Sequence, residues 1–205
     1  MGKAAIRSFA LLCVLGAALA LAVAGCQRQS EQLPPGIFAA ASGGNCLPDV
    51  TLVDQHGNAV NFADLKGKWL LVDFIYTRCA GTCELMTSKL VRAADHLGTA
   101  LGKNVEFVSI TLDPEHDGPK QLLNWARAQN AQRKGWLFLT GPLQNVEQVM
   151  AAFKVKRAVE PDGTIDHVIE FFLVGPGGRE RRLYSPNEAT PEAVANDVKA
   201  LASLS

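Results

Sequence analysis

The sequence predicts an α/β domain in which a central mixed sheet is flanked by helices. Apolar strand-like runs alternate along the chain with segments of helical periodicity, which is the pattern of that class. The 205 residues suit one domain with a short appendage. Because 48% of them are hydrophobic and only 20% are charged, a largely disordered chain is excluded. The formal net charge of zero gives no electrostatic support for nucleic-acid binding.

The first 45 residues carry targeting features rather than a fold. Lys3 and Arg7 precede the uncharged apolar run 8–24, which resembles a bacterial export signal. The run ends in Val-Ala-Gly-Cys at Cys26, which resembles a lipobox. We therefore expect residues 1–25 to be a signal peptide and Cys26 to carry the lipid, although an uncleaved membrane anchor is an alternative. Both interpretations leave the protein exported and membrane-tethered on the periplasmic side.

The segment after the lipidation site differs in composition from the domain that follows it. Residues 26–45 are polar and then rich in Pro, Ala and Gly, with no period of 2 or 3.6, so we interpret them as a flexible tether. The folded domain is expected over 46–205. Cys46 is an extra thiol at its start, interpreted as a surface group.

The first half of the domain shows a hairpin, two inner strands and a helix. A continuous apolar run of eight residues at 69–76 is typical of a central strand covered on both faces. The expected elements are a hairpin over 49–62 with its turn at 55–58, strands at 69–76 and 105–111, and a helix over 82–101 ended by Gly102.

The second half adds three helices and a late hairpin. We expect helices over 119–131 and 143–153, a strand at 136–139, a hairpin of 167–174 with 179–184, and a last helix capped by Thr190. The terminal hairpin makes the sheet mixed. This element order is that of a thioredoxin-like fold with an N-terminal hairpin and a late hairpin insertion.

Two cysteines lie where the first central strand meets its helix. Cys79 and Cys83 are separated by Ala-Gly-Thr, which lets the loop fold back so that the two sulfurs converge. The positive end of a helix favours thiolate and is expected to lower a cysteine pKa. Two converging thiolates can form a reversible disulfide or chelate a soft metal such as Cu(I) or Zn(II). A structural disulfide is the alternative, although so short a loop removes little chain entropy when it is closed.

A metal site needs a third ligand from elsewhere in the chain. The four histidines are His56, His96, His116 and His167. We interpret His56 and His96 as solvated, whereas His116 follows the second inner strand and His167 opens the late strand. Spacing alone does not make His167 a ligand, because a lone histidine is more often a surface residue.

Four motifs together resemble the Sco/SenC family of copper-handling proteins. They are Tyr-Thr-x-Cys-x-x-x-Cys at 76–83, Leu-Asp-Pro-x-x-Asp at 112–117, Asp-His at 166–167 before an apolar strand, and the early hairpin with Leu-Lys-Gly-Lys-Trp at 65–69. The resemblance implies that Cys79, Cys83 and His167 bind one copper ion, as Cu(I) or Cu(II). It suggests that Asp113 and Asp117 support the ligands or dock a partner, although turn-forming and capping roles explain them equally well.

The sequence departs from that family at two positions beside the motifs. Glu84 stands where Pro usually follows the second cysteine, and Val168 stands where Ser often follows the histidine. Met86 lies one turn after Cys83, and we interpret it as a core residue rather than as a thioether ligand.

The resemblance implies a metallochaperone for cytochrome c oxidase. Such a protein delivers copper to the oxidase subunit that carries the dinuclear copper A centre, or keeps the cysteines of that centre reduced. Another periplasmic copper chaperone or a thioredoxin-like reductase is a further candidate partner. The alternatives are enzymes: a thiol–disulfide oxidoreductase without copper delivery, which the three-residue spacer disfavours, and a peroxidase, which would need an activating arginine such as Arg78.

Overall fold

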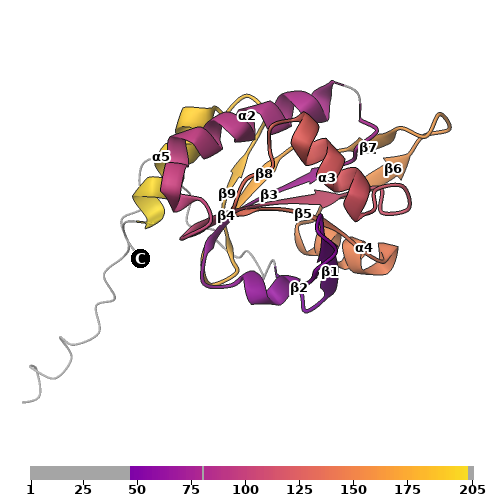
Figure 1. Ribbon diagram of the computed structural model, residues 1–205, viewed down its shortest axis with the longest axis horizontal. Helices are drawn as coiled ribbons and strands as arrows, with labels where there is room; N and C mark the ends of the chain where they lie inside the picture. The colour runs from indigo at the N-terminus through magenta and orange to yellow at the C-terminus, as the bar shows by residue number, and fades with distance from the viewer. Residues whose placement is uncertain (1–46, 80, 203–205) are drawn as a thin grey trace, which may run out of the picture. The chain divides into compact units, whose positions relative to one another are not determined.

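The computed structural model describes residues 47–79 and 81–202. Within these residues the main sheet has seven strands, in the order β2 (Ala59–Asn61), β1 (Thr51–Asp54), β5 (Trp136–Thr140), β4 (Val105–Thr111), β3 (Trp69–Ile75), β8 (Phe171–Val174) and β9 (Glu180–Tyr184) (Figure 1). Strands β3, β4 and β5 are parallel, whereas β1 and β8 join them antiparallel. The predicted mixed sheet is confirmed.

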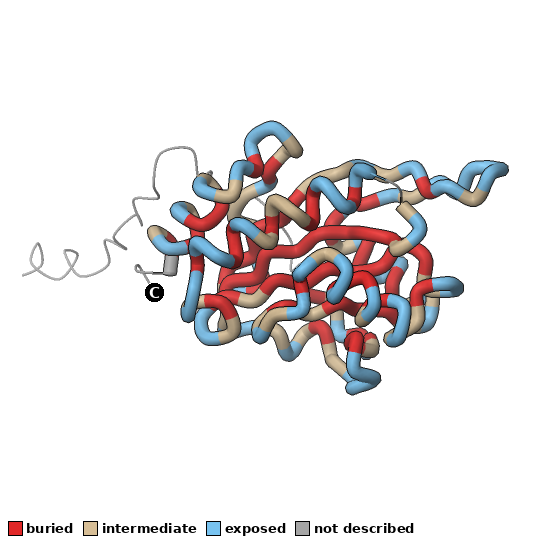
Figure 2. Tube along the Cα trace, turned by 45° about the horizontal axis from the view of Figure 1, so that its top comes forward, coloured by how far each residue is buried: buried red, intermediate tan, exposed pale blue. Residues whose placement is uncertain are grey.

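Helices cover both faces of this sheet. They are α2 (Thr82–Leu97), α3 (Pro119–Ala128), α4 (Leu143–Ala152) and α5 (Pro191–Ala202). Figure 1 shows α2 and α5 side by side on one face and α4 on the opposite face. Phe153, at the end of α4, packs edge-on against Phe74 of β3 and Phe172 of β8, at ring-centroid distances of 5.7 and 5.0 Å. The central strands of the sheet are therefore buried between the helices, as Figure 2 shows, whereas the edge strands β2 and β9 are more exposed.

Strand β3 and helix α2 position the cysteine segment. All seven residues of β3 are buried, as expected for an apolar run at the centre of a sheet. In α2 the buried residues recur at helical spacing, and Met86 is one of them. Leu85, an apolar residue in the first turn of the same helix, lies outside this stripe and is 57% exposed.

The early hairpin forms as predicted. Strands β1 and β2 pair antiparallel, and residues 55–58 make the turn between them. The Asp54 carboxylate accepts hydrogen bonds from the backbone N–H groups of His56 and Asn58, which fixes the turn. A short 3₁₀ helix (Phe62–Leu65) follows.

Two helices end earlier than expected. α2 ends at Leu97 rather than at Leu101, because Gly98 adopts a φ of 56° and its N–H caps the carbonyl of Ala94. A short 3₁₀ turn (Gly98–Ala100) fills the remainder. α3 ends at Ala128 rather than at residue 131.

The prediction of one strand over 167–174 is wrong. Two strands occupy this stretch, β7 (Ile165–His167) and β8, and residues 168–170 separate them. β7 pairs antiparallel with β6 (Arg157–Val159), a strand that the sequence analysis missed because three residues give too little period to detect. Val168 is 55% exposed, so the apolar run contains a residue that no core covers. Figure 1 shows the β6–β7 hairpin at one end of the domain, beyond the main sheet.

No helix among the described residues is both long enough and apolar enough to cross a membrane. The expected signal peptide at 1–25, the tether at 26–45, and the thiols Cys26 and Cys46 lie outside the described residues.

Candidate functional site

The two cysteines meet at the N-terminus of α2. Cys79 is half-buried, Cys83 is only 3% exposed, and both are free thiols. The backbone N–H of Cys83 donates a hydrogen bond to the Cys79 Sγ at 3.4 Å, so this sulfur lies over the first turn of the helix. Gly81 lies between them with a φ of 87°, a conformation that favours glycine and lets the loop reverse. The predicted convergence of the two cysteines on the helix end therefore agrees with the geometry.

The helix end was expected to lower a cysteine pKa, but the pKa of Cys83 is raised. Burial raises the pKa of the Cys83 thiol far above its usual value, and the neighbouring Cys79 sulfur raises it further. The reason is position: Cys83 lies inside the first turn of α2 and is buried, so its thiolate would lose contact with water. The two thiols are therefore unequal, with Cys79 the more accessible.

The backbone carbonyl of the next residue, Val168, orients the His167 imidazole. Its Nδ1 lies 3.0 Å from the carbonyl oxygen of Val168. A carbonyl can only accept, so Nδ1 carries the proton and Nε2 keeps its lone pair for a ligand. Burial lowers the pKa of His167, which favours the neutral imidazole that metals bind.

One small cavity connects His167 with the second cysteine. It measures about 10 Å³, and its walls include Cys83, Met86, His167 and Asp73. Among the residues that the structure describes, however, no three His, Cys, Asp or Glu side chains are close enough together to hold a metal ion. The structure thus brings Cys79 to Cys83 and Cys83 to the cavity of His167, without a closed three-ligand cluster.

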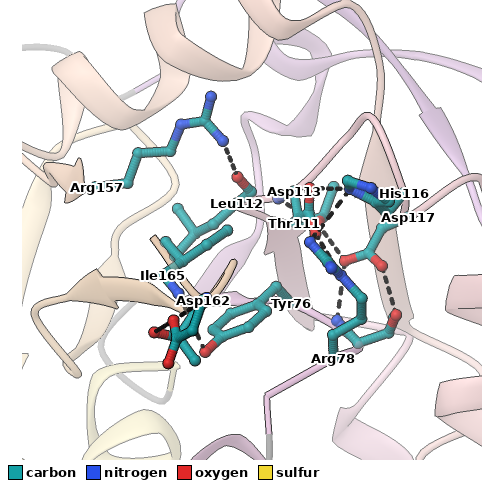
Figure 3. A network of polar contacts seen from close by, with 12 residues as sticks. Tyr76, Arg78, Thr111, Leu112, Asp113, His116, Asp117, Arg157, Asp162 and Ile165 are labelled. Carbon is teal, nitrogen blue, oxygen red and sulfur yellow. Dashed lines mark hydrogen bonds and ion pairs between the residues drawn. The ribbon is translucent and has the colours of Figure 1, made fainter. Parts of the chain in front are cut away.

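Asp117 anchors the segment that leads into the cysteine loop. It is fully buried in the turn between β4 and α3. Its carboxylate accepts hydrogen bonds from the Thr77 backbone N–H at 2.9 Å, from the Thr77 hydroxyl, and from the Thr111 hydroxyl at 2.6 Å (Figure 3). Asp117 therefore faces the interior, where it can support the cysteine loop but cannot dock a partner directly.

Asp113 binds Arg78, the residue directly before Cys79. Its carboxylate accepts from Arg78 Nε and Nη2 at 3.0 and 2.7 Å, and lies 2.8 Å from His116 Nδ1 (Figure 3). Burial would raise the pKa of Asp113, but the hydrogen bonds from His116 and Arg78 outweigh it and lower that pKa. His116, the other histidine at a strand end, is thus engaged with Asp113 and Arg78.

Sequence reasoning missed Asp73, which stands out on inspection as the one charged residue in the apolar run 69–76. It is 3% exposed and accepts a hydrogen bond of 2.6 Å from the Ser109 hydroxyl, which in turn accepts one from Trp136 Nε1 at 3.0 Å. Burial raises the pKa of Asp73 to about 7. A carboxyl that titrates near neutrality therefore lines the same cavity as Cys83.

The family model described as SCO1/SenC matches residues 40–203. This chain belongs to the SCO1/SenC family. A solved relative of the family is BsSco, a member of the Sco family of cytochrome c oxidase assembly proteins in which a disulfide switch was identified. It is 33% identical, with a TM-score of 0.66, and the match covers 78% of this chain and 94% of BsSco.

Two further solved SCO1/SenC structures are similar to this chain. ScoI of Bradyrhizobium japonicum, solved with copper bound, is 28% identical, and the match covers 73% of this chain and 94% of that one, with a TM-score of 0.63. A family lipoprotein of Bacillus anthracis str. Ames is 26% identical, with 76% and 94% coverage and a TM-score of 0.67. The predicted thioredoxin-like fold is confirmed by these SCO1/SenC neighbours.

Proposed function

We propose that Cys79, Cys83 and His167 bind one copper ion, as Cu(I) or Cu(II), and that copper is the cargo of this domain. The supporting observation is that two free thiols meet at the start of α2 while His167, with its Nε2 lone pair, lines the same cavity as Cys83. Two thiolates and one imidazole suit Cu(I), and the imidazole also allows Cu(II). The relative from Bradyrhizobium japonicum was solved with copper bound, which supports copper as the metal.

The proposed recipient is the dinuclear copper A centre of cytochrome c oxidase. Membership of a family that includes oxidase assembly proteins supports this role. The domain acts there in one of two ways. It transfers the copper ion, or it reduces the disulfide of the recipient, in which case two electrons and two protons leave the Cys79–Cys83 dithiol and a disulfide forms between these residues.

Asp113 and Asp117 have a supporting role in this proposal. Their carboxylates hold Arg78 and Thr77, the two residues before Cys79. These contacts fix the chain before Cys79 and therefore the position of its sulfur. The copper ligands in this proposal are the two cysteines and the histidine.

Copper stoichiometry tests the proposal. We expect the reduced protein to bind about one Cu(I) per chain in competition with a chromophoric chelator, and Cys79→Ser/Cys83→Ser to lose it, since the thiolates are the soft ligands. Cys46→Ser is the matched control and should keep full binding. Copper retained by the double variant would end the proposal.

A thiol–disulfide oxidoreductase without copper delivery is the second candidate. The unequal exposure of the two thiols favours it, because an accessible Cys79 can attack a substrate disulfide and a buried Cys83 can then resolve the mixed disulfide. Insulin reduction at a rate typical of oxidoreductases, with no copper bound, would favour this candidate. The peroxidase alternative is weaker, because the Arg78 guanidinium is bound to Asp113.

We further propose that the chain is exported and tethered to the membrane through a lipid on Cys26. The Val-Ala-Gly-Cys sequence supports this, as does the similarity to a family lipoprotein. Cys26→Ser should abolish incorporation of a labelled fatty acid and leave the precursor unprocessed. Label retained in the variant would show that the lipobox interpretation is wrong.

A further inference from the structure

Tyr76 connects the two parts of the proposed copper site. It follows β3 directly, and its backbone carbonyl accepts the N–H of Cys79 at 3.1 Å, which begins the cysteine loop. Its side chain is buried and extends to the other part, the β6–β7 hairpin. The phenol oxygen accepts the backbone N–H of Ile165 at 3.4 Å (Figure 3).

The Tyr76 ring also meets the proposed histidine ligand. Its centroid lies 6.2 Å from that of the His167 imidazole, and the two planes are 78° apart, an edge-to-face arrangement. Burial raises the pKa of the Tyr76 phenol, and the nearby Cys79 sulfur raises it further. The phenol thus stays neutral between the cysteine loop and the histidine strand.

The hairpin depends on such contacts because it lacks strand pairing with the main sheet. In the described part of the chain, β6 and β7 pair with each other in a separate two-stranded sheet. A second polar contact ties β6 down, from Arg157 Nη1 to the Leu112 carbonyl at 2.6 Å (Figure 3). Of these two contacts, the one from Tyr76 reaches the strand that carries His167.

We propose that Tyr76 is a positioning residue for the copper site. Its phenol oxygen holds Ile165, and its ring braces the imidazole two residues further on, so that His167 stays directed at the cysteines. The inference rests on the proposed copper function for its consequence, but the positioning itself is a property of the protein without copper.

Tyrosine substitutions test the positioning in two steps. Tyr76→Phe keeps the ring and removes the hydrogen bond to Ile165, whereas Tyr76→Leu removes both. The matched control is Tyr184→Phe, which changes the only other tyrosine in the sequence and removes a hydrogen bond of 2.9 Å to Asp197 on α5. This control reproduces the loss of a buried phenol hydrogen bond away from the hairpin.

The first measurement is hydrogen–deuterium exchange of the copper-free full chain in detergent micelles. In Tyr76→Phe the Ile165 amide should exchange about fivefold faster than in the wild type, the effect expected from one lost hydrogen bond. Tyr184→Phe should leave that amide unchanged. Equal exchange of Ile165 in the wild type and both variants would overturn the proposal.

The second measurement is Cu(II) affinity, read from the thiolate-to-copper charge-transfer band during competition with a chelator. We expect Tyr76→Phe to weaken Cu(II) binding about fivefold and Tyr76→Leu to weaken it further, while Cu(I), held by the two thiolates, changes less. Unchanged Cu(II) affinity in Tyr76→Leu would overturn the proposed consequence for copper. A wild-type protein that binds no copper would instead refute the proposed function, and amide exchange would still decide the positioning.

Discussion

The two parts of the proposed copper site are held in place very differently. The cysteine loop is fastened at consecutive residues, Thr77 to the buried Asp117 and Arg78 to Asp113. The β6–β7 hairpin, which carries His167, makes one polar contact at Ile165 and one at Arg157, beside the packing of the buried Ile165 side chain. Buried, fully satisfied polar groups fix one geometry, whereas a short hairpin outside the main sheet opens at low cost.

This difference suits the proposed function, in which the domain releases its copper ion to a recipient. A metal is handed over by ligand exchange, so at least one ligand has to leave while the others hold. We expect the histidine side to be the part that moves and the cysteine side to be the part that stays.

The largest effect should come from the fixed part of the site. Asp117→Asn keeps the shape of the side chain but places an amide N–H₂ among the Thr77 and Thr111 donors. We expect a loss of about 3 kcal/mol in the free energy of unfolding, because buried hydrogen bonds to a charged group are lost and their donors are left unsatisfied. Urea denaturation measures this, with the exposed Asp64→Asn as control. Equal stability of the two variants would contradict the claim that the cysteine loop is held more firmly than the β6–β7 hairpin.

A smaller effect should appear as a pH dependence of the free energy of unfolding, caused by Asp73 of β3. The pKa of Asp73 is raised to about 7 in the folded chain from an unfolded value of 3.8. Between these values the folded state keeps a proton that the unfolded state has lost, so stability falls as pH rises through this window. From pH 5 to pH 7 the loss should be about 2 kcal/mol relative to Asp73→Asn, which lacks the titrating group.

The comparison with Asp73→Asn isolates this contribution. The lowered pKa of His167 acts in the opposite direction below pH 7, and it is common to both proteins. Parallel stability curves for the wild type and Asp73→Asn would show that Asp73 does not titrate in this range.

The smallest effect on global stability should come from the hairpin. Asp162 accepts hydrogen bonds from the N–H and the hydroxyl of Thr164 and shapes the β6–β7 turn. We expect Asp162→Ala to speed local amide exchange in β6 and β7 while the urea midpoint stays within experimental error. A large shift of the midpoint would mean that the hairpin is part of the cooperative core.

The central parts of the fold were predictable because their signals are strong and local. The apolar run at 69–76, the helical stripe after Cys83 and the turn at 55–58 are set by burial and turn chemistry that sequence pattern reports. The β6–β7 hairpin was not predictable, because β6 has only three residues and the end of β7 at His167 falls inside an apolar stretch.

The candidate site also has features that the sequence predicts and features that it does not. The meeting of Cys79 and Cys83 followed from their place between a strand and a helix, whereas the high pKa of Cys83 depends on burial by distant residues. The roles of Tyr76 and Asp73 also depend on tertiary contacts, with Ile165 and Ser109 respectively. Single-residue identity carries no signal for such contacts.

The most direct test of the copper proposal compares the wild type with His167→Ala in both copper oxidation states. Two thiolates alone can hold Cu(I) in near-linear geometry, so the variant should keep about one Cu(I) per chain with weakened affinity. Cu(II) prefers nitrogen donors and more ligands, so its thiolate-to-copper charge-transfer band should be lost or strongly shifted. An unchanged Cu(II) band in His167→Ala would remove His167 from the site and contradict the account.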